Sequence, residues 1–313
     1  MHCIGIDMSK ASFHAALNDS SVEVFANTPE GIEQFMGALR TCECAPEETT
    51  IGVEATGVYH LLFSRILTTD GWKVMVINPM LSHRVINSSL RRVKTDRHDA
   101  QSLREATRMG FGYRFTDTPD VLALKALVTE RAALAKMRGQ IKTMIGSHTI
   151  REEAAGLQFH DSFAATLVTL SSEIAIIERK MDTYGTDTQK LLRTIPGIGK
   201  TSAAFLVAYI GDINRFENSE KLTAYIGLDC RVHESGTSIK GKGYLTKRGN
   251  TYLRHVLFMG AFVAAKKNLK LKAYFEKKRA EGKHYHSALC AVERKLVHLI
   301  YAVWSRRAPF ENR

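Results

Sequence analysis

The sequence lacks a long apolar run and a cysteine framework, and we expect no leader segment. No stretch reaches the roughly 20 apolar residues of a membrane-spanning helix, and the start does not join a basic region to an apolar one. The 5 cysteines are too scattered for a disulfide scaffold, and Cys42 and Cys44 lack the second pair that a zinc site needs. We therefore expect a cytoplasmic protein with free thiols, and we exclude membrane-spanning and disulfide-rich secreted classes.

Acidic residues are scarce in the last third of the chain. The 313 residues carry a net charge of +12 and suffice for two or three domains. Residues 1–110 have 11 Lys and Arg against 13 Asp and Glu, whereas residues 191–313 have 23 against 9. A basic block with interleaved aromatic side chains is typical of nucleic-acid binding. A basic surface that only aids solubility is the alternative.

Two predicted strands end on a carboxylate. The apolar run at residues 2–7 ends at Asp7, and the run at 49–54 ends at Glu54. A charge at the end of a buried strand is costly to desolvate unless it is paired or meets a metal ion, although Asp7 could also be a solvated turn residue. Further strands are expected at 11–17, 21–26 and 72–77. One helix is expected to begin at Pro29, with Thr28 as its N-cap, and another near residue 58, so the pattern predicts a mixed α/β sheet.

A third acidic position lies at the start of a helix predicted to end near residue 109. Thr95 is the expected N-cap, and Asp96 and Asp99 are three residues apart, so they share one face of that helix. First-turn acids can simply complement the helix dipole. Together with Asp7 and Glu54, however, they form the kind of cluster that binds Mg²⁺ or Mn²⁺ through hard oxygen ligands and supports phosphodiester chemistry.

The middle of the chain has helical periodicity without an internal proline. Apolar residues recur at helical spacing over 119–150 and again over 161–184. We interpret them as two long antiparallel helices in a coiled-coil hairpin. An ordinary helical core is the alternative.

The basic third contains two glycine-rich segments. Pro196-Gly197-Ile198-Gly199-Lys200 opens a predicted helix at 201–210 and resembles a helix-hairpin-helix turn, in which backbone N–H groups and the helix N-terminus favour a phosphate. The second segment, residues 233–250, is polar, flexible and basic, and we expect it to bind a DNA phosphate. A serine there could attack phosphorus if its proton is removed. Its basic residues are Lys240, Lys242, Lys247 and Arg248.

Several motifs resemble one known family. Gly5-Ile6-Asp7-Met8-Ser9-Lys10, Glu54-Ala55-Thr56-Gly57 and Lys94-Thr95-Asp96-Arg97-His98-Asp99 look like the three acidic blocks of the DEDD transposases, the insertion-sequence one-ten family that includes the Piv-type DNA invertases. The resemblance continues through Pro196-Gly197-x-Gly199, Gly227-Leu228, Glu234-Ser235-Gly236 and Lys247-x-Gly249-Asn250-x-x-Leu253-Arg254, so it covers nearly the whole chain. Cys230 departs from it, because proline is usual after Gly-Leu-x.

The resemblance implies a fold and a mechanism. It implies a RuvC-like (RNase H-like) domain at 1–110, a coiled-coil hairpin at 111–190 that mediates dimerisation, and a mainly helical transposase domain at 191–313. Asp7, Glu54, Asp96 and Asp99 would be catalytic acids that bind Mg²⁺ or Mn²⁺, and Ser235 would be the nucleophile that forms a phosphoserine link to DNA. Thr237 and Ser238 lie close enough for that assignment to shift. The implied nucleic-acid contacts are Gly197, Gly199, Lys200, Lys240, Lys242, Lys247, Arg248 and Arg254.

The resemblance also implies partners. These are double-stranded DNA at the element ends and at the target, a bridge RNA that selects both, and a homodimer that becomes a tetramer when synapsed. Three other functions are the alternatives. An actin-like sugar kinase would need further phosphate and adenosine motifs, which the sequence lacks. A RuvC-like junction nuclease would use only the four acids and leaves the Ser235 segment unexplained. A non-catalytic nucleic-acid-binding protein leaves the separately placed acids unexplained.

Overall fold

The computed structural model describes residues 2–55, 57–79, 95–156, 162–231, 234–235, 239–240, 244–246 and 249–311. The chain divides into two units, Met1–Thr118 and Pro119–Arg313, and each is described by itself. The division into three domains, with boundaries at residues 110 and 190, remains a prediction.

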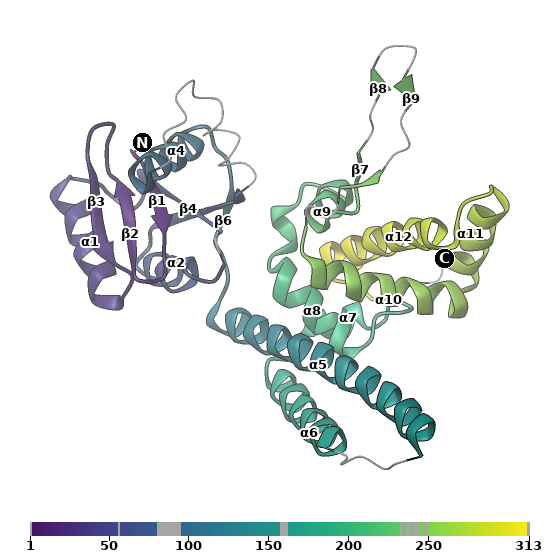
Figure 1. Ribbon diagram of the computed structural model, residues 1–313. Coiled ribbons are helices and arrows are strands. Elements are labelled where there is room, and N and C mark those ends of the chain that lie inside the picture. The colour runs from purple at the N-terminus through teal and green to yellow at the C-terminus, as the bar shows by residue number, and fades with distance from the viewer. Residues whose placement is uncertain are drawn as a thin grey trace. The chain divides into compact units, whose positions relative to one another are not determined.

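The N-terminal unit is built on a six-stranded mixed sheet with the order β3-β2-β1-β4-β5-β6 (Figure 1). β1 pairs in parallel with β4 and antiparallel with β2, and β4 pairs in parallel with β5. The five strands expected from the sequence are confirmed, whereas β6 is too short to give a periodic signal. The strands are β1 (His2–Met8), β2 (Ser12–Ala16), β3 (Val22–Ala26), β4 (Thr49–Glu54), β5 (Lys73–Ile77) and β6 (Tyr113–Arg114).

Helices pack on both faces of this sheet. Phe13 of β2 contacts Phe35 of α1 (Pro29–Thr41) and Phe63 of α2 (His60–Thr69), so these two helices cover one face. The other face carries α4 (Asp96–Arg108). Gly5 in β1 is required by this packing, because a Cβ there would collide with the backbone of α4 at Ala100 and Arg104.

The predicted N-caps of α1 and α4 are confirmed. The Thr28 hydroxyl accepts from the Gly31 N–H at 3.2 Å, and the Thr95 hydroxyl accepts from the His98 N–H at the same distance. Each satisfies a backbone donor that the first helical turn leaves unpaired. The Thr95 cap therefore defines where the helix carrying Asp96 and Asp99 begins.

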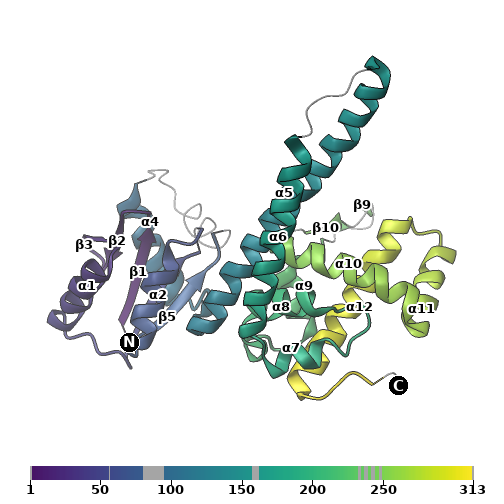
Figure 2. The same cartoon turned by 90° about the horizontal axis from the view of Figure 1, so that it is seen from below.

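The C-terminal unit is mostly helical, as expected. α5 and α6 run antiparallel as a hairpin (Figure 2), and Leu124 and Val128 of α5 share a hydrophobic core with the helices that follow. That the hairpin is a coiled coil, and that a helix-hairpin-helix turn precedes α8, remain predictions. The helices are α5 (Pro119–Ala155), α6 (Ser162–Thr183), α7 (Asp187–Leu192), α8 (Lys200–Ile210), α9 (Ser219–Ile226), α10 (Thr251–Lys267), α11 (Leu269–Ala280) and α12 (Tyr285–Arg306), with a 3-10 turn at Ile213–Arg215.

The segment between α9 and α10 contains short strands where the sequence predicted only a flexible loop. β7 (Cys230–Arg231) pairs antiparallel with β10 (Tyr244–Leu245), and β8 (Glu234–Ser235) pairs antiparallel with β9 (Ile239–Lys240). Strands of two residues are too short to produce an alternating pattern in the sequence. No helix among the described residues is long and apolar enough to cross a membrane.

Candidate active site

Asp7 and Glu54 lie on the face of the sheet that α4 covers. Side chains alternate along a strand, and Gly5 and Gly52 both face α4, because a Cβ on either would collide with that helix. Asp7 comes two residues after Gly5, and Glu54 comes two residues after Gly52, so both side chains lie on this same face. β1 and β4 are parallel, with Ile6 opposite Val53, so these two carboxylates are neighbours at the same end of the sheet.

Asp96 and Asp99 bring two more carboxylates to this end. Both lie in the first turn of α4. His14, the β2 partner of Asp7, places its Nδ1 4.0 Å from the nearer Asp96 carboxylate oxygen. The Asp96 side chain is 73 % exposed, so this is the solvent-accessible edge of the cluster, whereas Asp99 is half-buried.

The pKa of Asp7 responds to the charges of the other three carboxylates. The pKa of Asp7 is raised to about 6, chiefly by burial and then by the charges of Asp99, Asp96 and Glu54, in that order. His14 opposes the shift. The carboxylates of Glu54, Asp96 and Asp99 therefore all repel a negative charge on Asp7. A bound cation would reduce this repulsion.

The residues at this cluster suit a hard divalent cation. The buried Oδ1 of Asp99 has no hydrogen-bond partner among the described residues, and carboxylate oxygens are the ligands that Mg²⁺ and Mn²⁺ prefer. Within the described part of the chain, no three acidic, histidine or cysteine side chains are gathered tightly enough to hold one ion. The four acids are therefore near one another but are not arranged here to coordinate a single ion.

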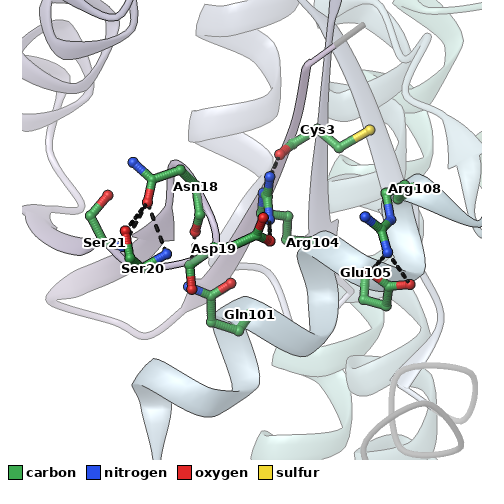
Figure 3. Close-up of polar contacts among 9 residues, drawn as sticks. All are labelled: Cys3, Asn18, Asp19, Ser20, Ser21, Gln101, Arg104, Glu105 and Arg108. Atoms are coloured by element: carbon green, nitrogen blue, oxygen red, sulfur yellow. Dashed lines mark hydrogen bonds and ion pairs between the residues drawn. The ribbon is translucent and has the colours of Figure 1, made fainter.

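Polar contacts behind the cluster fix the orientation of α4 (Figure 3). Arg104 donates from Nε to the Cys3 carbonyl at 2.8 Å and forms an ion pair with Asp19. One turn earlier, Gln101 donates to the Asn18 carbonyl at 2.9 Å. Arg104 therefore ties α4 to β1 and to the turn between β2 and β3, and Gln101 ties it to the same turn.

Ser235 lies in the C-terminal unit, on β8 and opposite Ile239 of β9. Only its backbone is described, and Lys240 is likewise placed by its backbone in β9. The predicted phosphate contacts Lys242, Lys247 and Arg248 lie outside the described residues.

Three of the predicted nucleic-acid contacts have structural partners. Gly197 has a φ of +90°, and a Cβ there would collide with the Gly260 carbonyl of α10, so packing alone requires this glycine. The Lys200 Nζ donates to Asp182 at 2.6 Å. Arg254 donates to two backbone carbonyls and a hydroxyl. Gly199 differs, because it caps α8 without a side-chain bond and has open space around it.

Sequence reasoning missed two residues near these sites. His14 faces Asp7 across the β1–β2 pair, and strand alternation in a predicted hairpin could have revealed it. Glu293 is buried on α12. Its position at helical spacing from Leu289 and Leu296, in an otherwise apolar stripe, was the available signal.

Comparison with known families supports the resemblance. Residues 4–148 match a family model described as a transposase, of the DEDD type associated with IS110. Residues 189–276 match a second model, described as the transposase IS116/IS110/IS902 family. The first match contains all four acids of the cluster, and the second contains Ser235 and Arg254.

Similar proteins include both invertases and transposases. The chain is 27 % identical over 321 residues to a pilin gene-inverting protein from Moraxella bovis, covering 99 % of this chain and 98 % of the relative. It is 25 % identical over 339 residues to the transposase for insertion sequence element IS1328 from Yersinia enterocolitica, again covering 99 % and 98 %. It is also 25 % identical to the IS1111A transposase from Coxiella burnetii, over 74 % of this chain and 72 % of the relative. Residues 4–148 match a DEDD-type, nuclease-like domain, which suggests dependence on a divalent metal. The chain belongs to the IS110/IS116/IS902 family of transposases, which act on DNA.

Proposed function

We propose that this protein is a transposase or site-specific recombinase of a bacterial insertion sequence, and that it exchanges DNA strands through a phosphoserine intermediate at Ser235. The observation that carries the proposal is the convergence of Glu54, Asp96 and Asp99 on Asp7. Structural packing does not explain four mutually repelling carboxylates, whereas phosphodiester chemistry requires such a cluster.

Asp7, Glu54, Asp96 and Asp99 would hold Mg²⁺ or Mn²⁺. A divalent cation at such a site neutralises charge on the scissile phosphate and aids deprotonation of a nucleophile. The half-buried Asp99 carboxylate, with its unpartnered Oδ1, suits a direct ligand. The exposed Asp96 suits a ligand at the side from which DNA enters.

Ser235 would carry the covalent step. Its oxygen forms a bond to phosphorus as the bond from phosphorus to a deoxyribose oxygen breaks. The serine hydroxyl loses its proton, and the departing deoxyribose oxygen gains one. The phosphodiester energy is conserved in the serine ester, so the reverse attack by another DNA end completes strand exchange without an external energy source. The assignment to Ser235 rests on the Glu234-Ser235-Gly236 motif.

The basic third of the chain would bind duplex DNA. Residues 191–313 carry 23 Lys and Arg against 9 Asp and Glu, which suits several phosphate contacts. The proposed contacts are those predicted from the sequence. Gly199 at the N-terminus of α8 differs from Gly197 in having open space around it. An N-terminus without a side-chain cap leaves backbone N–H groups for a phosphate.

Assembly and guidance are further parts of the proposal. The α5–α6 hairpin exposes about half or more of the side chains of Met137, Met144 and Val168, which suits packing against a second copy in a homodimer and in a synaptic tetramer. A bridge RNA that selects donor and target, and action in the cytoplasm, rest on the family resemblance alone. The catalytic acids and the serine could come from different protomers.

Substitution of the acids tests the proposal. Asp7→Asn and Asp99→Asn should abolish strand exchange and leave the fold near wild type, because each removes a charge and keeps the side-chain volume. Glu105→Gln is the matched control, since Glu105 lies on the same helix and pairs with Arg108 instead. Full recombination by both variants in Mg²⁺ would contradict the proposal.

A further inference from the structure

Arg254 joins the two ends of the segment that carries Ser235. Its Nη1 donates to the carbonyl of Ile226, the last residue of α9, at 3.1 Å. The same nitrogen donates to the Gly249 carbonyl at 2.5 Å, and Nη2 donates to the Thr251 hydroxyl at 3.2 Å. A single guanidinium therefore bridges the chain where it leaves α9 and where it enters α10, across residues 227–248.

The backbone is closely packed at this bridge. A Cβ on Gly249 would collide with the Tyr225 and Ile226 backbone at the end of α9. Gly227 adopts a φ of 82°, a left-handed conformation that directs the chain away from the helix. Both ends of the segment are thus in direct contact before the strands begin.

Pairing continues from the bridge toward Ser235. The Thr246 N–H donates to the Asp229 carbonyl at 3.0 Å, and the Thr246 hydroxyl donates to the Asp229 carboxylate. Beyond this contact β7 pairs with β10, and then β8, which contains Ser235, pairs with β9. The contacts are nested, with the Arg254 bridge at one end and the β8–β9 pair at the other.

The Arg254 guanidinium lies near α12. Arg254 is half-buried, and its charge acts on Glu293, a carboxyl that is 2 % exposed on α12. The next residue on α12, Arg294, donates to the Cys230 sulfur at 3.6 Å. A guanidinium that already donates to three oxygens on the protein is an inefficient phosphate ligand and an efficient structural clamp.

We propose that Arg254 is a positioning residue for strand exchange, which clamps the ends of residues 227–248 and thereby places Ser235 for attack. The inference rests on the proposed function of Ser235 and revises the expected role of Arg254, which becomes a bridge between two carbonyls in place of a DNA phosphate contact. Lysine retains the charge but lacks the rigid planar group whose Nη1 contacts both carbonyls while its Nη2 contacts the Thr251 hydroxyl. The two roles therefore make opposite predictions for Arg254→Lys.

The test compares the full-length wild type, Arg254→Lys and Arg254→Met by three measurements. Clamping predicts that both variants lose hydrogen-exchange protection at the Thr246 amide. It predicts that both form the protein–DNA adduct roughly 100-fold more slowly at saturating nicked DNA, the effect of a misplacement of about 1 Å. It also predicts an unchanged Kd for DNA and an unchanged salt dependence of that Kd. The inference is overturned if Arg254→Lys behaves as wild type. It is equally overturned if Arg254→Met reduces the log–log salt slope by about 0.9, the signature of a lost phosphate contact.

A second variant perturbs the clamp without changing charge. Gly249→Ala introduces a collision at the end of α9, and it should reproduce the exchange and adduct defects of Arg254→Lys. Gly139→Ala in α5 is the control, because a Cβ there meets nothing nearby. If Gly249→Ala retains wild-type exchange at Thr246 and wild-type adduct formation, the clamp is refuted. If the wild type itself forms no adduct, the function proposed for Ser235 fails, and Thr246 exchange still decides whether Arg254 clamps the segment.

Discussion

Replacing Glu293 by glutamine should stabilise the C-terminal unit at alkaline pH. The Glu293 side chain lies on α12 and is 2 % exposed, and its Oε1 has no hydrogen-bond partner among the described residues. Burial raises the pKa of this carboxyl from 4.5 to about 8, and the positive charge of Arg254 only partly opposes the shift. The folded protein therefore holds a proton on Glu293 that the unfolded chain releases at neutral pH.

The sign and size of the effect follow from this difference. Because the pKa is higher in the folded state, the stabilising contribution is complete below pH 4.5 and is lost as the pH rises through about 8. One pKa unit corresponds to about 1.4 kcal/mol, so the full loss is about 5 kcal/mol at most. Glutamine has the same shape and does not titrate. The stability of Glu293→Gln relative to wild type should therefore increase steadily from pH 5 to pH 8 and then level off.

Tryptophan fluorescence can isolate this unit. The chain has 2 tryptophans, Trp72 in the N-terminal unit and the buried Trp304 on α12 itself. In a Trp72→Phe background, urea unfolding monitored through Trp304 reports the free energy of unfolding of the C-terminal unit at each pH. Glu276→Gln on the surface of α11 serves as control. Parallel pH profiles for wild type and Glu293→Gln would refute the reasoning.

Three other predictions concern metal, DNA and assembly. Mg²⁺ at about 100 times its dissociation constant should stabilise the wild-type N-terminal unit by about 2.7 kcal/mol, followed through Trp72, and should stabilise Asp7→Asn far less; equal stabilisation would exclude a metal site at Asp7. The affinity of the full chain for duplex DNA should fall with salt by about 0.9 log units per phosphate contact per log unit of salt; a nearly flat dependence would contradict binding through the basic third. Removing the outer part of the hairpin, residues 138–172, should lower the oligomer mass in light scattering while Trp72 fluorescence stays native; an unchanged mass would count against dimerisation there.

The elements that carry the four acids could be predicted because each depends on residues that are near one another in the sequence. Asp7 and Glu54 each end an apolar strand, and Thr95 caps the helix that carries Asp96 and Asp99. Each of these signals lies within a few residues of the side chain concerned. Alternation along the strands then places both strand acids on the face that α4 covers, which the collisions at Gly5 and Gly52 confirm.

The features that escaped prediction depend on residues far apart in the sequence. The hydrogen bond from Arg254 to Ile226 spans the whole Ser235 segment, and the two-residue strands of that segment have no periodicity to detect. The bonds from α4 to Cys3 and Asn18 connect positions more than 80 residues apart. Such contacts form only in the completed fold, so they cannot be read from local sequence. A segment rich in lysine and glycine therefore predicts a phosphate-binding loop, although Arg254 and Gly249 also have packing roles.

Serine attack and water attack differ in one product, and that product tests the central claim most directly. Serine attack joins the protein covalently to a DNA end, whereas water attack by the acidic cluster alone leaves free ends. On a nicked substrate that traps the intermediate, the account predicts an adduct that survives denaturation and maps to Ser235 by mass spectrometry. Ser235→Ala should lose the adduct and strand exchange yet keep DNA binding, and Ser238→Ala should retain all three. An adduct on Thr237 or Ser238 would contradict the assignment of Ser235 while preserving the mechanism. Recombination by Ser235→Ala, with free DNA ends and no trapped adduct from the wild type, would contradict the mechanism itself and favour a junction nuclease.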